Sequence, residues 1–192
     1  MLKGLLSETR DTQTVFRKLL SAMASPGEIG QVDINLNCPG SLHPASGAIL
    51  LTMLDYSTPF WSDLENGSKE IQWIRFHTGA PFVHMKSRAL FALAVDYDRL
   101  VNPDSFNPGT LESPDHSTTL LVQTRGVGHN GRIRLTGPGI PSETYLKLGG
   151  IKETFLKRRA TLIQDYPLGI DMIFISDDRF VAIPRTTVME VL

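Results

Sequence analysis

The fold is decided by the stretch 166-YPLGIDMIFISDDRFVAIPRTT-187, which contains two apolar runs. The runs Ile170–Ile175 and Phe180–Ile183 flank the polar turn Ser176–Arg179, which is the pattern of a β-hairpin. The first run is apolar on both faces except for Asp171, and such a run is typical of a strand that is covered on both sides. We therefore expect this hairpin to lie inside the sheet around which the chain folds.

The rest of the chain alternates between helix and strand patterns. Apolar spacing predicts helices over residues 11–23, 45–54 and 151–164, and Ser142 is expected to cap a further helix that ends at Gly149-Gly150. Strands are predicted over residues 31–34, 60–61, 71–76, 89–95, 118–123 and 132–136, with a hairpin tip over 126–131. We therefore expect one domain over residues 1–192, an α/β fold with a mixed central sheet and helices on both faces.

The composition excludes several classes of protein. Hydrophobic residues make up 41% of the 192 residues, which favours a globular chain over a disordered one. With 19 basic against 20 acidic residues, no nucleic-acid partner is expected. No apolar run approaches the roughly 18 residues of a membrane span, and the first ten residues lack a signal-peptide core, so we expect a cytoplasmic protein.

Neither the cysteine nor the histidines predict a metal or thiol site. Cys38 is the single cysteine, lies in an Asn-Cys-Pro-Gly turn and is expected to be a turn residue rather than a nucleophile. The histidines lack the short spacings of zinc ligands, so no metal site is expected; they are His43, His77, His84, His116 and His129.

Two short motifs are candidates for ligand binding. His77 and Gly79 are predicted at the end of a strand, where open α/β sheets place general acids and bases; the alternative is a histidine that bonds a turn. Gly137 and Gly139 are predicted between a strand and a helix, where main-chain N–H groups attract phosphate. The alternative there is a turn that needs glycine conformations, and Pro138 removes one donor.

Asp171 is the most unusual single residue because it interrupts an apolar strand. A buried carboxylate must be paired or protonated, and Arg185, just beyond the second strand, is the expected partner. The pair is either part of a ligand site or a structural ion pair.

Several stretches together resemble a known family. They are 16-FRKLLSAMASPG-27, 54-LDYSTP-59 with Trp61, 76-FHTGAP-81, 136-TGPGI-140, 167-PLGID-171 and 184-PRTT-187. In this order they resemble the PhnH family, subunits of the bacterial carbon–phosphorus lyase system, over nearly the whole chain.

The resemblance implies an accessory or non-catalytic role in a larger assembly. It implies partners of the PhnG, PhnI and PhnJ types, with PhnL, and a homodimer when the chain is isolated. That assembly makes alpha-D-ribose 1-methylphosphonate 5-triphosphate from ATP and methylphosphonate in organic phosphonate catabolism, so the chain would be a subunit of a transferase complex without being an enzyme alone.

The resemblance also implies a fold similar to the large domain of pyridoxal-phosphate-dependent transferases, without that cofactor. In agreement, no lysine follows Lys157, so the hairpin offers no Schiff-base lysine. The alternative function is a small-ligand enzyme that binds a phosphonate or nucleotide near His77, Gly137 and Asp171.

Overall fold

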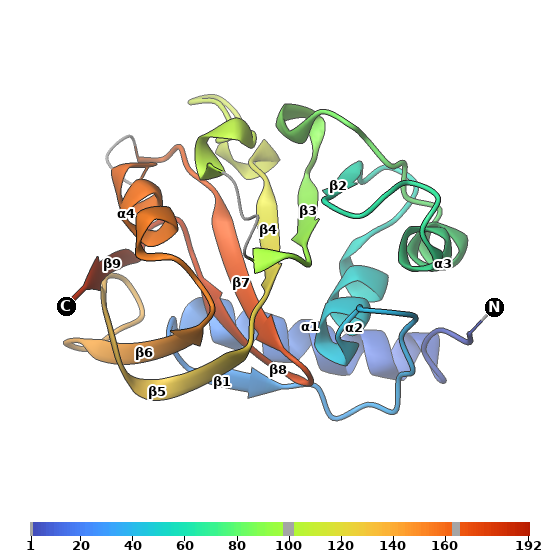
Figure 1. Cartoon of the computed structure of the whole chain (residues 1–192), viewed down its shortest axis with the longest axis horizontal. Coiled ribbons are helices and arrows are strands. Elements are labelled where there is room, and N and C mark those ends of the chain that lie inside the picture. The colour runs from blue at the N-terminus through green and yellow to red at the C-terminus, as the bar shows by residue number, and fades with distance from the viewer. Residues whose placement is uncertain (1, 98–101, 163–165) are drawn as a thin grey trace.

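The chain folds around a six-stranded sheet whose strand order is β1-β8-β7-β4-β3-β2 (Figure 1). The computed structural model describes residues 2–97, 102–162 and 166–192. Strands β2, β3, β4 and β7 are parallel, whereas β8 is antiparallel to β7 and β1 is antiparallel to β8. The strand bounds are β1 Ile29–Gln31, β2 Phe60–Ser62, β3 Phe91–Ala94, β4 Thr119–Gln123, β7 Asp171–Ser176 and β8 Arg179–Ile183.

The predicted hairpin is confirmed as β7 and β8, which pair from Met172↔Ile183 to Ser176↔Arg179. Successive side chains of a strand point to opposite faces, so Ile173 and Phe174 enter different cores. Both are buried, which explains why the first run is apolar on both faces apart from Asp171.

Different layers cover the two faces of the sheet. The helices α1 (Glu8–Ala24), α2 (Pro44–Met53) and α3 (Lys69–Thr78) pack on one face. The other face is covered by α4 (Glu153–Leu162) and a small sheet of order β6-β5-β9. The small sheet consists of β5 Gly126–Thr136, β6 Thr144–Gly149 and β9 Val188–Val191, and short 3₁₀ turns occupy Lys86–Arg88, Pro103–Ser105 and Pro114–His116. The predicted α/β class with a mixed central sheet and helices on both faces is thus confirmed.

The predicted strand over residues 71–76 is wrong, because this segment lies in α3. Ser68 caps the helix, since its Oγ accepts a hydrogen bond from the Ile71 N–H at 3.3 Å. Trp73 and Ile74 are buried with Ile71, a spacing that suits a helix face as well as a loosely alternating strand. Gly79 ends the helix in the left-handed region with φ 71°.

The predicted helix after Ser142 is also wrong, because the segment forms strand β6. Leu146 is buried while Lys147 is exposed, which is the period of a strand that pairs with β5. The predicted hairpin tip over 126–131 lies within β5 instead. A bulge separates His129 from Ile133 there, and a Cβ on Gly131 would lie 2.2 Å from the Leu146 carbonyl oxygen.

The other predicted helices and strands have counterparts in the structure. The strand expected over 31–34 lies slightly earlier, at β1. The helix expected over 151–164 is α4, and Ile163 and Gln164 at its predicted end lie outside the described residues. Within the described residues, none of the helices has both the length and the apolar character that crossing a membrane requires.

Candidate functional site

A cavity of about 340 Å³ lies where the parallel strands β3, β4 and β7 end. This carboxyl edge is where open α/β sheets place their ligands. The lining residues come from the loops that follow the three strands and from the start of α2; they are His43, Val95, Tyr97, Gln123, Thr124, Arg125, Ser176 and Asp177. We call this hollow the edge cavity.

His43 joins the start of α2 to two strand ends of the edge cavity. The Asp177 N–H donates to His43 Nδ1 at 3.0 Å, and the His43 N–H donates to Gln123 Oε1 at 2.8 Å. Gln123 in turn donates from Nε2 to the Ser41 carbonyl at 2.8 Å. The Nδ1 atom that accepts the Asp177 N–H carries no proton in this geometry. Burial lowers the pKa of His43, although the charge of Asp177 and the Ile175 carbonyl raise it.

Arg125 and Tyr97 supply the cation and the hydroxyl of the edge cavity. Arg125 Nε donates to the Tyr97 hydroxyl, and its guanidinium carbon lies 5.1 Å from the centre of the Tyr97 ring. The pair stiffens two loops and presents polar groups to the cavity. A small ligand with anionic or hydroxyl groups is the chemistry that this lining suits.

The sequence predictions missed the edge cavity, although a usable signal was present. His43, Tyr97, Arg125 and Asp177 come from separate stretches that share no motif. Three of them follow predicted strands within a few residues, and the carboxyl ends of parallel strands meet at one edge.

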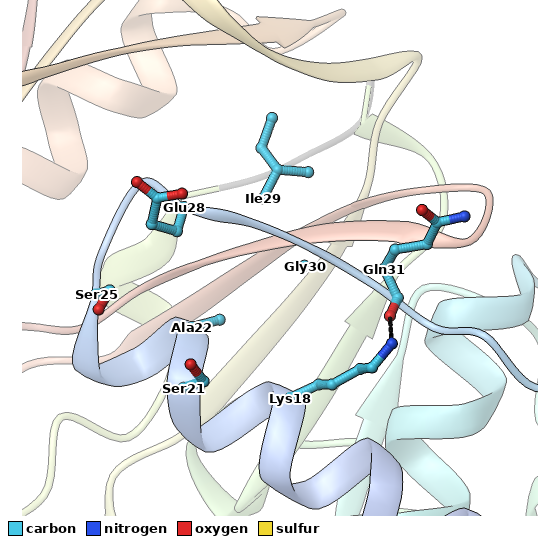
Figure 2. Close-up of a pocket in the computed structure, with 8 residues that line it drawn as sticks. All are labelled: Lys18, Ser21, Ala22, Ser25, Glu28, Ile29, Gly30 and Gln31. Carbon is cyan, nitrogen blue, oxygen red and sulfur yellow. Dashed lines mark hydrogen bonds between the residues drawn. The ribbon is translucent and has the colours of Figure 1, made fainter.

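A second hollow, of about 320 Å³, lies between α1 and the edge strand β1 (Figure 2). We call it the β1 groove; its lining residues are Lys18, Ser21, Ala22, Ser25, Glu28, Ile29, Gly30 and Gln31. Half of them belong to the stretch 16–27 that resembles the family.

His77 lies in α3 and Gly79 caps the end of that helix, so neither lies at the end of a strand. His77 Nε2 is 3.1 Å from the Leu2 carbonyl oxygen, and its ring packs edge-on against Trp73 and Phe76 at 5.1 Å. The Gly79 N–H donates to the Arg75 carbonyl at 2.9 Å and ends the helix. His77 thus joins α3 to the N-terminal segment, and Gly79 ends the helix.

Asp171 and Arg185 form the expected ion pair at the amino end of β7. Their side chains are only 14% and 17% exposed, and Arg185 Nη1 also donates to the Pro114 carbonyl. Nearby, the buried Arg159 donates to the carbonyls of Thr187 and Pro184. Burial lowers the pKa of Arg159 to about 10, although the Asp171 charge raises it.

Gly137 and Gly139 lie in the turn between β5 and β6, and no helix follows them. A Cβ on Gly139 would lie 2.3 Å from the Ala24 carbonyl oxygen, and one on Gly137 would lie 3.0 Å from the Thr186 carbonyl oxygen. The φ angle is 138° at Gly137 and 83° at Gly139. The glycines therefore allow the turn to approach the end of α1 and the segment after β8.

The structure brings together only some of the residues expected in one site. Gly137 contacts Thr186, beside Arg185 and its partner Asp171. His77 lies instead in α3, on the opposite side of the molecule from β5 and β6 (Figure 1). Cys38 is half-buried, and burial raises the pKa of its thiol to about 12, which opposes a role as nucleophile.

Comparisons with known proteins identify the family. Residues 3–190 match the family described as bacterial phosphonate metabolism protein (PhnH). The chain is 35% identical over 181 residues to the subunit PhnH of alpha-D-ribose 1-methylphosphonate 5-triphosphate synthase from Rhizobium meliloti (strain 1021), covering 94% of this chain and 90% of that protein. It is 28% identical over 176 residues to the putative C-P lyase subunit protein HtxG from Stutzerimonas stutzeri, covering 91% and 84%. The chain therefore belongs to the PhnH family, as its six family-like stretches predicted.

Proposed function

We propose that this chain is an accessory, non-catalytic subunit of a carbon–phosphorus lyase assembly. In this role it is needed to make alpha-D-ribose 1-methylphosphonate 5-triphosphate from ATP and methylphosphonate. The observation that carries the proposal is the 35% identity, over 94% of the chain, to a protein named as a subunit of that synthase. The partners we propose are subunits of the PhnG, PhnI and PhnJ types, with PhnL.

The polar residues that would be the best candidates for catalysis all have structural contacts, which supports an accessory role. Asp171 is paired with Arg185, and His77 bonds the N-terminal segment. Arg159 holds the β8–β9 connection through two carbonyls. Each of these groups already has a structural partner, which favours architecture over catalysis.

Co-expression tests the proposal directly. We expect the chain to co-purify with PhnG-, PhnI- and PhnJ-type subunits, and the purified chain alone to release no adenine from ATP and methylphosphonate. Turnover by the chain alone, or failure to bind any of these subunits, would overturn the proposal.

A second candidate function is the binding of a small phosphonate or nucleotide in the edge cavity. It is favoured by the cation of Arg125 and the hydroxyl of Tyr97 at the carboxyl ends of the strands. A ligand that binds the folded chain raises its melting temperature by mass action. We expect millimolar ATP or methylphosphonate to raise it in the wild type and not in Arg125→Ala; no shift in the wild type argues against this function.

We also propose that the main sheet corresponds to the large domain of pyridoxal-phosphate-dependent transferases and carries no such cofactor. The residues at the edge cavity do not fit the cofactor, because none of its lining residues is a lysine. Lys86 lies over the Trp61 ring at 4.7 Å, and Lys147 lies on β6. An absorbance band of protein-bound pyridoxal phosphate near the edge of the visible range in the purified protein would contradict this proposal.

A further inference from the structure

The β1 groove exposes the open edge of the main sheet. β1 is the last strand in the sheet order, and among the described residues its one strand neighbour is β8. An open strand edge offers main-chain donors and acceptors to another extended chain.

The register shows which main-chain groups face the groove. The Val32 N–H donates to the Asp178 carbonyl at 2.8 Å, so Val32 and Gly30 face β8. In an antiparallel pair the residues between them, Ile29 and Gln31, direct their N–H and C=O groups to the open side. Outside the β1–β8 ladder, none of the main-chain hydrogen bonds within residues 2–97, 102–162 and 166–192 involves the N–H or C=O of Ile29.

Lys18 forms a hydrogen bond with one of these outward-facing main-chain groups. Its ammonium donates to the Gln31 carbonyl at 2.7 Å and also pairs with Asp33, as Figure 2 shows for the first contact. The Lys18 ammonium therefore lies where the N–H group of an added strand would donate to the Gln31 carbonyl. Because Lys18 lies on a flexible stem, it can yield this carbonyl to a strand and keep its ion pair with Asp33.

The helix wall of the groove leaves room for side chains of an added strand. Ser21, Ala22 and Ser25 are small, and Gly30 has no side chain. The side chains of Ile29 and Gln31 point away from α1 (Figure 2), so they do not fill the groove.

We propose that the β1 groove receives an extended segment of another subunit of the assembly, which adds to the main sheet as a strand beside β1. The proposal rests on the proposed function. Glu28 is exposed at one end of the groove and forms no ion pair within the described part of the chain. A basic side chain of the segment is therefore expected to pair with Glu28, while small or polar side chains face Ser21 and Ser25.

A bulky residue in the groove tests the proposal. Ser21→Trp fills the groove from the exposed flank of α1, so we expect retention by tagged PhnG-, PhnI- and PhnJ-type subunits to weaken by about tenfold or more. Thr9→Trp is the matched control, because Thr9 is exposed on α1 and about 100° per residue places it opposite the groove. Equal retention of wild type, Ser21→Trp and Thr9→Trp would overturn the inference and leave the proposed function intact. Failure of the wild type to bind would overturn both.

Residue-resolved hydrogen–deuterium exchange of the β1 amides tests the same proposal without any substitution. In the isolated chain we expect the Ile29 and Gln31 amides to exchange fast and the Val32 amide slowly. In the co-purified complex, Ile29 and Gln31 should slow by at least about tenfold because a neighbouring strand accepts their hydrogen bonds. Fast exchange of both amides in an intact complex would refute the proposal, and slow exchange in the concentrated chain alone would assign the edge to a second copy instead.

Discussion

The Asp171 carboxylate and the Arg185 guanidinium face each other across the ends of β7 and β8. Arg185 Nη2 lies 2.7 Å from Asp171 Oδ2, and Arg185 Nε lies 3.3 Å from Asp171 Oδ1. The Arg185 N–H donates to the same carboxylate at 2.7 Å, so Asp171 binds both the main chain and the side chain of its partner. This arrangement fixes the point where the chain leaves β8.

Removal of Asp171 should destabilise the fold. Asp171→Ala leaves Arg185 mostly buried without its counter-charge, and we expect the free energy of unfolding to fall by about 3 kcal/mol. Urea denaturation measures this change. The control is Asp104→Ala, which removes an exposed contact of 3.0 Å with Arg158 and should cost less than about 1 kcal/mol. Equal losses in the two variants would show that burial of the Asp171 pair is unimportant.

Gly139 should tolerate no side chain. In Gly139→Ala the new Cβ would meet the Ala24 carbonyl oxygen at 2.3 Å in a backbone conformation with φ 83°, so we expect a loss of at least about 2 kcal/mol. Gly126→Ala is the comparison, because a Cβ there meets nothing within 4 Å. Its effect on thermal or urea unfolding should stay within about 1 kcal/mol. A stable Gly139→Ala variant would contradict the close approach of this turn to α1.

His43 should make stability depend on pH. Because burial lowers its pKa in the folded chain, the unfolded chain binds the proton more readily. Its contribution to stability is therefore complete above the unfolded pKa of about 6.5 and is lost as the pH falls from there towards the folded pKa. Protonation of Nδ1 also removes the acceptor for the Asp177 N–H.

Urea denaturation of wild type and His43→Asn between pH 4 and 8 checks this pH dependence. Asn keeps an acceptor without a titrating group, so the difference between the two curves should change across this range. Parallel curves would show that His43 does not carry the pH dependence.

The two serines predicted or observed as helix caps should differ in their effects. Ser68 caps α3, so Ser68→Ala should cost about 1 kcal/mol. Ser142 is exposed and precedes strand β6, so Ser142→Ala should change the free energy of unfolding by no more than about 0.5 kcal/mol. A larger cost at Ser142 than at Ser68 would restore the helix that the sequence alone predicts.

The elements that could be predicted are those whose local pattern and tertiary position agree. The strands around Ile173 and Leu121 are apolar on both faces because both faces of the sheet are covered. The stretch at Trp73 was mistaken because its apolar residues Ile71, Trp73, Ile74 and Phe76 fit either period. The cap at Ser68 decides between the two. The stretch at Tyr145 was mistaken because its pairing with β5, a distant contact, outweighs a local helix signal.

The candidate site was less predictable than the fold. The Asp171 pair could be predicted because a carboxylate in an apolar strand requires a partner, and Arg185 lies just beyond the paired strand of the same hairpin. The edge cavity joins residues from four separated stretches, and only the parallel order of β3, β4 and β7 brings them to one edge. The β1 groove exists because β1 is the edge strand of the sheet, and no local residue pattern in the sequence predicts which strand lies at the edge.

The contact between Gly139 and the Ala24 carbonyl has a consequence for how relatives of this chain are recognised. Two of the stretches that mark the family touch there, so the residues at this contact are needed for the fold itself. A duplicated gene that lost its place in the assembly would still retain them for as long as its product folded. Change along the open edge of β1 and at groove residues such as Ser21, rather than at this contact, would be the first trace of such a loss.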